Sequence, residues 1–303
     1  MHSRWFSVAV VVLWLTSMGW LVGKKVLPSL WVGDPPDSRT ILAARLNEPL
    51  VGWTMYLNSQ RMGWALNSLT PLPTGMTKAH SRVHFEGFPL SQSAPDWLHT
   101  LVGHFGGQFQ MELASDLEYD TLGRLSAFRS AARFPPLEEA AIKVTGIIDG
   151  AQMQLTIRSG NTAKPYETQL AAPRNSMLND GLSPQTRLPG LREGQSWTIE
   201  VYSPLQPPNP NSPQDPREIL LATVEGREPV FWAGKHTPCW VVVYRSDSAT
   251  AAHQSAKPVG KVWVRPDGLI LKQQVSVFGA TVSFVRLTEA QALSLAHEVH
   301  YQP

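Results

Sequence analysis

The residues able to do chemistry in this sequence are few, and their surroundings argue against a catalytic centre. The single cysteine, Cys239, follows Pro238 inside the apolar run HTPCWVVVYR, a pattern typical of a buried strand. A nucleophilic cysteine needs an accessible position beside a base, and burial in apolar surroundings raises the thiol pKa instead. Neither a Gly-x-Ser-x-Gly elbow nor a Ser-x-x-Lys motif occurs. We therefore predict a structural role for Cys239, no catalytic residues and no enzymatic activity.

The histidines do not combine into a metal site. His80 and His84 alternate with other residues in HSRVHFEGF, as they would in a strand, where residues four apart lie roughly 13 Å from each other. A second pair, His99 and His104, falls on different faces of an expected helix. No third ligand at metal-site spacing accompanies either pair. The sequence thus predicts no metal ligands and no cofactor.

Composition excludes several further classes of protein. The 303 residues carry a formal net charge of +2, which leaves no basic block for binding nucleic acid. One cysteine excludes an intramolecular disulfide framework, and 43% hydrophobic residues exclude wholesale disorder. The chain is instead rich in tryptophan and proline, with 11 and 25 residues.

The N-terminal segment is the strongest local signal. Nineteen uncharged residues run from Trp5 to Gly23, and as a helix they would extend about 28 Å, close to the thickness of a bilayer's apolar core. Lys24 and Lys25 follow. The alternative is a cleaved signal peptide, but the run is longer than a typical signal core, and no small-residue cleavage site precedes the lysines. We predict a single transmembrane anchor over residues 1–25.

Tryptophans in and beside this segment are the candidate contact residues for membrane or partner. Trp5 and Trp20 suit the two membrane interfaces, whereas Trp14 would lie near the bilayer centre. An indole N–H at that depth lacks water, so Trp14 either packs on lipid or faces a neighbouring helix or ring-shaped cofactor of a partner. Trp31 follows the predicted membrane exit and is either an interfacial belt residue or a partner contact.

The remaining chain predicts a mainly β body. Residues 26–50 form a connector that includes a short helix at residues 39–46. Two β regions follow, 51–180 and 181–303, which form two modules or one continuous domain. Apolar and polar residues alternate at 109–114, 151–158 and 197–201, and glycine-containing turns separate the runs. We expect a curved antiparallel sheet, or two such sheets, or a β-sandwich.

Two short helices interrupt the predicted strands. The first covers Ser93–His104. The second covers Thr288–His300, which opens with a Thr-Glu-Ala-Gln capping box and would pack through Ala290, Leu293 and Ala296. Six prolines within Pro204–Pro216 predict a long loop between two strands.

The stretch VGWTMYLNSQRMGWALNSL, residues 51–69, resembles the opening hairpin of an extracytoplasmic β module found ahead of bacterial transglutaminase-like domains. The residues that carry the resemblance are Gly52, Trp53, Tyr56, Asn58, Gly63 and Trp64. Ser59 stands where the pattern has a turn glycine. Residues 188–205 and 262–275 resemble later strands of the same module. No transglutaminase domain is present.

The resemblance covers most of residues 51–287 and implies a curved sheet like that of periplasmic lipoprotein carriers. It also favours export, which would place a single-pass protein in the bacterial inner membrane with its body in the periplasm. A strict count of Lys24 and Lys25 against Arg4 favours a cytoplasmic body instead.

Two functions remain open after these exclusions. The first is a non-enzymatic accessory or scaffold subunit of a membrane-embedded complex, in its most specific form a photosynthetic reaction-centre or light-harvesting assembly. The second is a module that binds lipid or another apolar ligand in a half-barrel. A concave face filled by side chains would favour the scaffold, and an open apolar cavity would favour the carrier.

Overall fold

The fold is known from a computed structural model, which describes residues 4–21, 38–46, 48–57, 59–86, 110–135, 137–160, 164–172, 179–180, 183–202, 217–246, 258–277 and 280–301. Within these residues the protein is mainly β, as predicted. The helices are α1 (Arg4–Leu21), α3 (Ser38–Arg45) and α5 (Glu289–Glu298). The strands are β1 (Val51–Leu57), β2 (Gln60–Pro71), β3 (Thr77–Phe85), β4 (Met111–Tyr119), β5 (Leu125–Phe134), β6 (Leu137–Asp149), β7 (Gln152–Ser159), β8 (Tyr166–Ala171), β9 (Asn179–Asp180), β10 (Ser196–Tyr202), β11 (Arg217–Trp232), β12 (Lys235–Ser246), β13 (Gly260–Val264), β14 (Ile270–Val277) and β15 (Ala280–Arg286).

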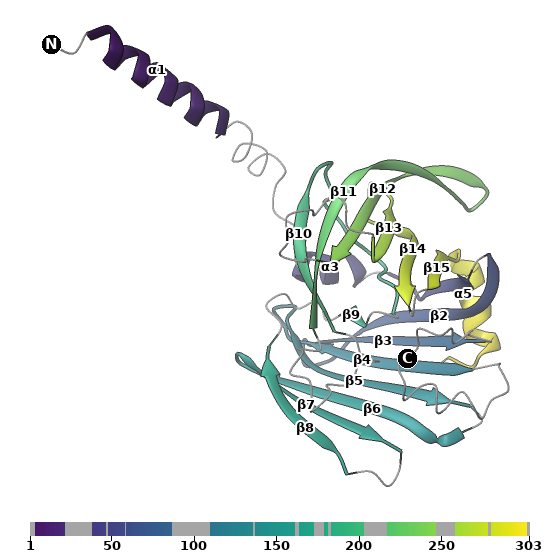
Figure 1. Cartoon of the computed structure of the whole chain (residues 1–303). Coiled ribbons are helices and arrows are strands. Elements are labelled where there is room, and N and C mark those ends of the chain that lie inside the picture. The colour runs from purple at the N-terminus through teal and green to yellow at the C-terminus, as the bar shows by residue number, and fades with distance from the viewer. Residues whose placement is uncertain are drawn as a thin grey trace.

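All strands of the described residues belong to one sheet. Its order is β8-β7-β6-β5-β4-β3-β2-β1-β15-β14-β13-β12-β11-β10-β9, and every neighbouring pair is antiparallel except β9 with β10. Sheet neighbours are thus consecutive strands of the chain, apart from the central pair of β1 and β15, and the consecutive strands β8 and β9 form the two edges. Figure 1 shows the sheet bending, with β10–β13 arching above the strands β3–β8. The predicted curved antiparallel sheet is confirmed, and the sandwich alternative is not.

Alternating side chains give part of the sheet one dry and one wetter face. In β3, residues Thr77, Ala79, Ser81, Val83 and Phe85 are buried, and the residues between them are partly exposed. A strand with this period has its buried residues on one face, and Val83 and Phe85 place that face of β3 in the main core. In contrast, β12 is buried on both faces from Val241 to Tyr244, so alternation cannot be seen there.

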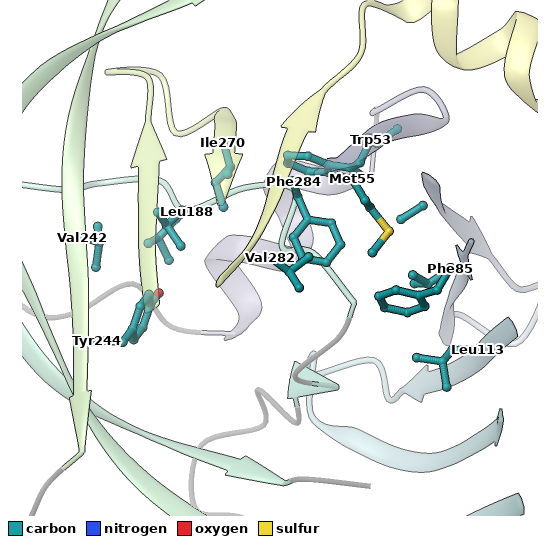
Figure 2. Close-up of a cluster of buried hydrophobic side chains, with 14 of the residues drawn as sticks. Trp53, Met55, Phe85, Leu113, Leu188, Val242, Tyr244, Ile270, Val282 and Phe284 are labelled. Atoms are coloured by element: carbon teal, nitrogen blue, oxygen red, sulfur yellow. The ribbon is translucent and has the colours of Figure 1, made fainter. Parts of the chain in front are cut away.

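The main hydrophobic core lies on the concave face of the central strands (Figure 2). Trp53 and Met55 of β1 and Phe284 of β15 are fully buried there, together with Phe85 of β3. Ile41 brings α3 onto the same core. The two halves of the sheet are therefore joined by packing as well as by the hydrogen bonds between β1 and β15.

A crossing segment, residues 183–188, also lies against this central part of the sheet. The Leu188 amide donates to the Gly268 carbonyl over 2.8 Å, and the Ile270 amide donates to the Thr186 carbonyl over 3.1 Å. Leu188 is only 1% exposed. The protein's own chain thus occupies the centre of the concave face.

Helix α5 packs on the opposite, convex face. The predicted capping box is present, because Thr288 and Gln291 bond reciprocally. The predicted packing stripe is wrong for Ala290 and Leu293, which are exposed (Leu293 by 54%), whereas Ala296 packs on the cluster beside the buried Ala292 and Leu295. The helix approaches β1 so closely that a Cβ at Gly52 would lie 2.9 Å from that of Ala292, and this contact selects the buried side.

Helix α1 has 18 residues and is drawn apart from the sheet in Figure 1. Among the residues that the structure describes, no helix combines the length and apolar character needed to cross a membrane. The predicted transmembrane anchor over residues 1–25 is therefore not supported. The predicted helix Ser93–His104 and the proline-rich loop Pro204–Pro216 lie outside the described residues.

Candidate functional site

The predicted contact tryptophans are placed only in part. Trp14 and Trp20 of α1 are 59% and 67% exposed, and Trp5 belongs to the same helix. Trp31 lies outside the described residues. The neighbours of Trp14 and Trp20 along the helix are also exposed and apolar: Val11, Val12, Leu13, Leu15, Met18 and Leu21. Together these side chains give α1 an exposed apolar surface from Val11 to Leu21.

A second apolar surface lies on the concave face of β4–β8, here called the concave arm. Its floor consists of buried residues, namely Leu125, Phe128, Val144, Met153 and Leu155. Around that floor lie apolar residues that remain partly exposed, namely Leu117, Tyr119, Ile142, Ile148, Ile157 and Leu170. Packing at the arm is thus less complete than at the central strands.

Close packing of Phe128 on β6 shapes the floor of the arm. A Cβ built on Gly146 would lie 2.0 Å from the Phe128 ring, so glycine is required for the ring to lie against the strand. Phe128 and Gly146 are also direct cross-strand partners. Gly146 therefore allows the Phe128 ring to pack flat against the backbone of β6.

A row of polar residues separates the arm from the main core. Asn67, Ser81, Ser115 and Ser130 are successive cross-strand partners on β2, β3, β4 and β5. The Trp53 indole donates to the Asn67 side chain over 3.0 Å, and Asn67 donates to Ser81 over 3.0 Å. A buried polar row is stable only when its members are hydrogen-bonded. These contacts separate the two apolar regions over β2–β5, whereas Ile142 of β6 packs against both regions.

Arg45 is the last residue of α3, a helix that lies against the β4–β5 turn next to the arm, since a Cβ built on Gly123 would lie 3.2 Å from Arg39 Cα. Burial raises the pKa of the Tyr119 phenol, while the positive charge of Arg45 opposes that rise. The Nε atom of Arg45 is buried and lacks a hydrogen-bond partner. No carboxylate pairs with Arg45 within the described residues, in contrast to Arg245, whose Nη1 lies 2.6 Å from Glu225.

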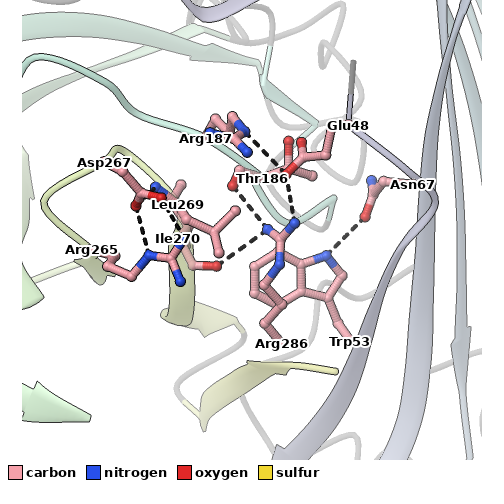
Figure 3. Close-up of polar contacts among 10 residues, drawn as sticks. All are labelled: Glu48, Trp53, Asn67, Thr186, Arg187, Arg265, Asp267, Leu269, Ile270 and Arg286. Atoms are coloured by element: carbon pink, nitrogen blue, oxygen red, sulfur yellow. Dashed lines mark hydrogen bonds and ion pairs between the residues drawn. The ribbon is translucent and has the colours of Figure 1, made fainter. Parts of the chain in front are cut away.

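In the central polar network of Figure 3, the Arg286 guanidinium is paired by comparison, although the Thr186 hydroxyl there is buried without a hydrogen-bond partner among the described residues. Arg286 donates from Nη2 to Glu48 over 2.6 Å and from Nη1 to the carbonyls of Thr186 and Ile270. Burial lowers the pKa of Arg286, and the Glu48 carboxylate opposes that change. Arg187 also donates to Glu48, over 3.2 Å. This network holds the crossing segment against the ends of β14 and β15.

The convex face carries a Ser68–His80–Asp116 row of cross-strand partners. His80 Nδ1 lies 2.5 Å from Asp116, and Lys78 Nζ lies 3.1 Å from the same carboxylate. Partial burial opposes ionisation of Asp116, but hydrogen bonds from His80 and Lys78 lower its pKa. The Ser68 hydroxyl instead bonds to Tyr301 Oη, over 3.0 Å. The row therefore lacks the serine-to-histidine hydrogen bond of an activated nucleophile.

Cys239 lies in β12 and is fully buried, as predicted. Burial raises the pKa of its thiol to about 11; Arg265 opposes this rise and Asp267 adds to it. A thiol in this state is a poor nucleophile at neutral pH. Within the described residues, no group of three or more His, Cys, Asp or Glu side chains could hold a metal ion.

The concave arm and Arg45 were missed by the sequence analysis. The alternating residues Met153, Leu155 and Ile157 indicated a strand with a buried face, but no sequence signal distinguishes a fully covered face from a partly covered one. Arg45 was one cation in a short helix, and its position beside Tyr119 depends on contacts between residues 74 positions apart.

No protein-family model matches the chain, and no curated protein is significantly similar to it in sequence. Three solved structures show limited similarity. A β-barrel-like protein of a domain of unknown function, DUF1849, from Brucella abortus has 8% identity and a TM-score of 0.46, over 79% of this chain and 95% of that one. A DUF1089 family protein from Pseudomonas aeruginosa has 15% identity and a TM-score of 0.31, over 68% and 87%. The hypothetical lipoprotein YmcC from Escherichia coli has 13% identity and a TM-score of 0.29, over 87% and 94%.

Proposed function

We propose that this protein is a non-enzymatic, extracytoplasmic accessory subunit whose helix α1 docks its β body onto a larger membrane complex. The observation that carries the proposal is the exposure of every apolar side chain described in α1, from Val11 to Leu21. Such a surface is stable in water only when lipid or protein covers it. Side chains fill the centre of the concave face, which favours a rigid scaffold and argues against an open ligand cavity at the central strands.

The chemistry of the described residues supports a non-enzymatic role. The thiol of Cys239 is buried, and the Ser68 hydroxyl is bonded to Tyr301 and not to His80. An accessory subunit needs neither group to react, because its contribution is contact surface. A photosynthetic reaction-centre or light-harvesting complex is one such partner, in which Trp14 would face a pigment or a neighbouring helix.

Substitution of one exposed tryptophan tests the docking role. The full chain, tagged at its C-terminus, is purified from gently solubilised native membranes, and its N-terminus is sequenced. We expect α1 to be retained and membrane subunits to co-purify in a fixed ratio. Trp14→Glu should reduce their yield at least about tenfold, because an ionised side chain is costly to bury in an apolar contact.

Phe231→Glu is the matched control, since Phe231 is 63% exposed but belongs to the β11–β12 hairpin. It should leave the co-purifying subunits unchanged. A mature N-terminus that begins after Leu21 would overturn the proposal, because α1 would then be a removed signal peptide. Equal loss with both variants would show that α1 is not the docking element.

A second candidate function, binding of an apolar ligand, is favoured by the partly exposed side chains of the concave arm. Ile148, Ile157 and Leu170 lie on the same face of three adjacent strands. A ligand chain that covered them would complete the packing of the floor. Mass spectrometry of lipids extracted from the purified full chain, compared with an Ile148→Asp variant, tests this function. Identical lipid content in the two samples would contradict it.

A further inference from the structure

We infer that the ligand of the concave arm is a single-chain anionic amphiphile, a fatty-acid carboxylate, whose head group pairs with Arg45 and whose chain lies across β4–β8. This inference rests on the second candidate function and specifies its ligand. The helix that carries Arg45 adjoins the arm, because a Cβ built on Gly123 in the β4–β5 turn would lie 3.2 Å from Arg39 Cα of α3, and Tyr119, at the end of β4 before that turn, packs against the floor of the arm.

The charge of Arg45 supports an anionic head group. A guanidinium that is partly removed from water without a counter-ion is destabilising, and it is stabilised by a carboxylate that accepts its hydrogen bonds. Within the described chain Arg45 has no such partner, and its Nε is buried. The other guanidiniums of the concave interior, Arg187 and Arg286, already share Glu48. Arg45 is therefore the cation available to a ligand at this end of the arm.

The dimensions and polarity of the arm support a single aliphatic chain. From β4 to β8 there are four strand-to-strand steps, which span about 19 Å, comparable to an extended long acyl chain. Partly exposed apolar residues line this path from Leu117 and Tyr119 to Ile157 and Leu170. On the side facing the main core, the polar row at Ser115 and Ser130 bounds it. A single chain fits a path with one apolar strip and one cationic end.

Paired probes separate the head-group inference from the binding function. The full chain is immobilised through a C-terminal tag, washed free of detergent and equilibrated with labelled oleate or labelled oleyl alcohol, which differ in charge at the head group. We expect oleate to bind at least about tenfold more tightly, as for a hydrogen bond to a charged group. Arg45→Met should abolish this preference and leave oleyl alcohol unchanged, whereas Arg45→Lys should retain most of it.

Two matched variants control for folding and for binding elsewhere on the chain. Ile148→Asp, in the arm, should weaken both probes, whereas Ile147→Asp should weaken neither, because Ile147 lies on the opposite face and is 61% exposed. Arg39→Gln controls for α3, since Arg39 is exposed in the same helix. Equal binding of both probes to the arm, unaffected by Arg45→Met, would overturn the head-group inference alone. Binding unaffected by Ile148→Asp would overturn the binding function as well.

Discussion

At the scale of single residues, the ionisable groups of this protein differ mainly in whether their partners are already present. Asp116 contacts Lys78 and His80 on the convex face, and Arg286 has Glu48 in the core, whereas Arg45 lacks a carboxylate within the described chain. An ionised side chain with an oppositely charged partner in the folded chain affects stability, whereas one without such a partner can pair with a ligand. This difference separates the structural polar residues from the candidate ligand contact.

Asp116 gives a pH-dependent contribution to stability. Its pKa is lowered in the folded protein by His80 and Lys78, against the opposing effect of partial burial. The stabilisation is therefore present above the ordinary carboxyl pKa and is lost as the pH falls through the lowered value. We expect Asp116→Asn to cost about 1 kcal/mol or less at neutral pH, as for a partly exposed ion pair. Urea denaturation at a series of pH values measures this cost.

The control for Asp116 is Asp149→Asn, because Asp149 forms no ion pair within the described residues. It should show little cost at any pH. A cost of Asp116→Asn that stays constant down to about pH 2, well below the ordinary carboxyl range, would contradict the proposed origin of the stabilisation.

At the scale of elements, local sequence patterns predicted several of the strands and the helices α3 and α5. β7 and β10 have one dry and one wetter face, so alternation located them, and Thr288 with Gln291 marked the start of α5. The buried side of α5 was not predicted, because the close approach of Gly52 to Ala292 decides it. The pairing of β1 with β15 could not be predicted either, because no local sequence pattern specifies a partner strand more than 200 residues away.

The contact between Gly52 and α5 predicts a graded loss of stability. A Cβ at residue 52 would lie 2.9 Å from that of Ala292 and 3.0 Å from Leu287 Cδ1, so the helix must shift. We expect Gly52→Val to lower the free energy of unfolding by about 1–3 kcal/mol, as for an overpacked core. Chemical denaturation measures the loss.

A double-mutant cycle separates this contact from a general effect of β1. Ala292→Gly removes the opposing Cβ, so Gly52→Ala should cost less in that background than in the natural protein. Additive costs of Gly52→Ala and Ala292→Gly would show that the two positions do not crowd each other.

At the scale of the whole molecule, the buried network around Glu48 joins segments from both ends of the chain. Glu48 precedes β1, Arg187 belongs to the crossing segment, and Arg286 ends β15. Removing one partner of a buried ion pair leaves an uncompensated charge. Loss of this network should therefore destabilise the body as a unit.

We expect Glu48→Gln to lower the free energy of unfolding by about 3–5 kcal/mol, because Arg286 would remain buried without its counter-ion. Asp267→Asn removes the partner of Arg265 in a more exposed ion pair, and it should lower the free energy of unfolding by about 1 kcal/mol or less. Unfolding followed by tryptophan fluorescence and by far-ultraviolet circular dichroism measures both costs. Separate transitions by the two probes would show that the sheet halves unfold independently.

The strand order has a consequence for synthesis of the chain. β1 is made early but its second neighbour, β15, is among the last segments to leave the ribosome. Until then β1 presents an open backbone edge, which is prone to pair with other chains. The two outer borders of the finished sheet, β8 and β9, are instead close together in mid-sequence. This protein therefore completes its middle last, and nascent chains halted before β15 should aggregate while those halted after it should not.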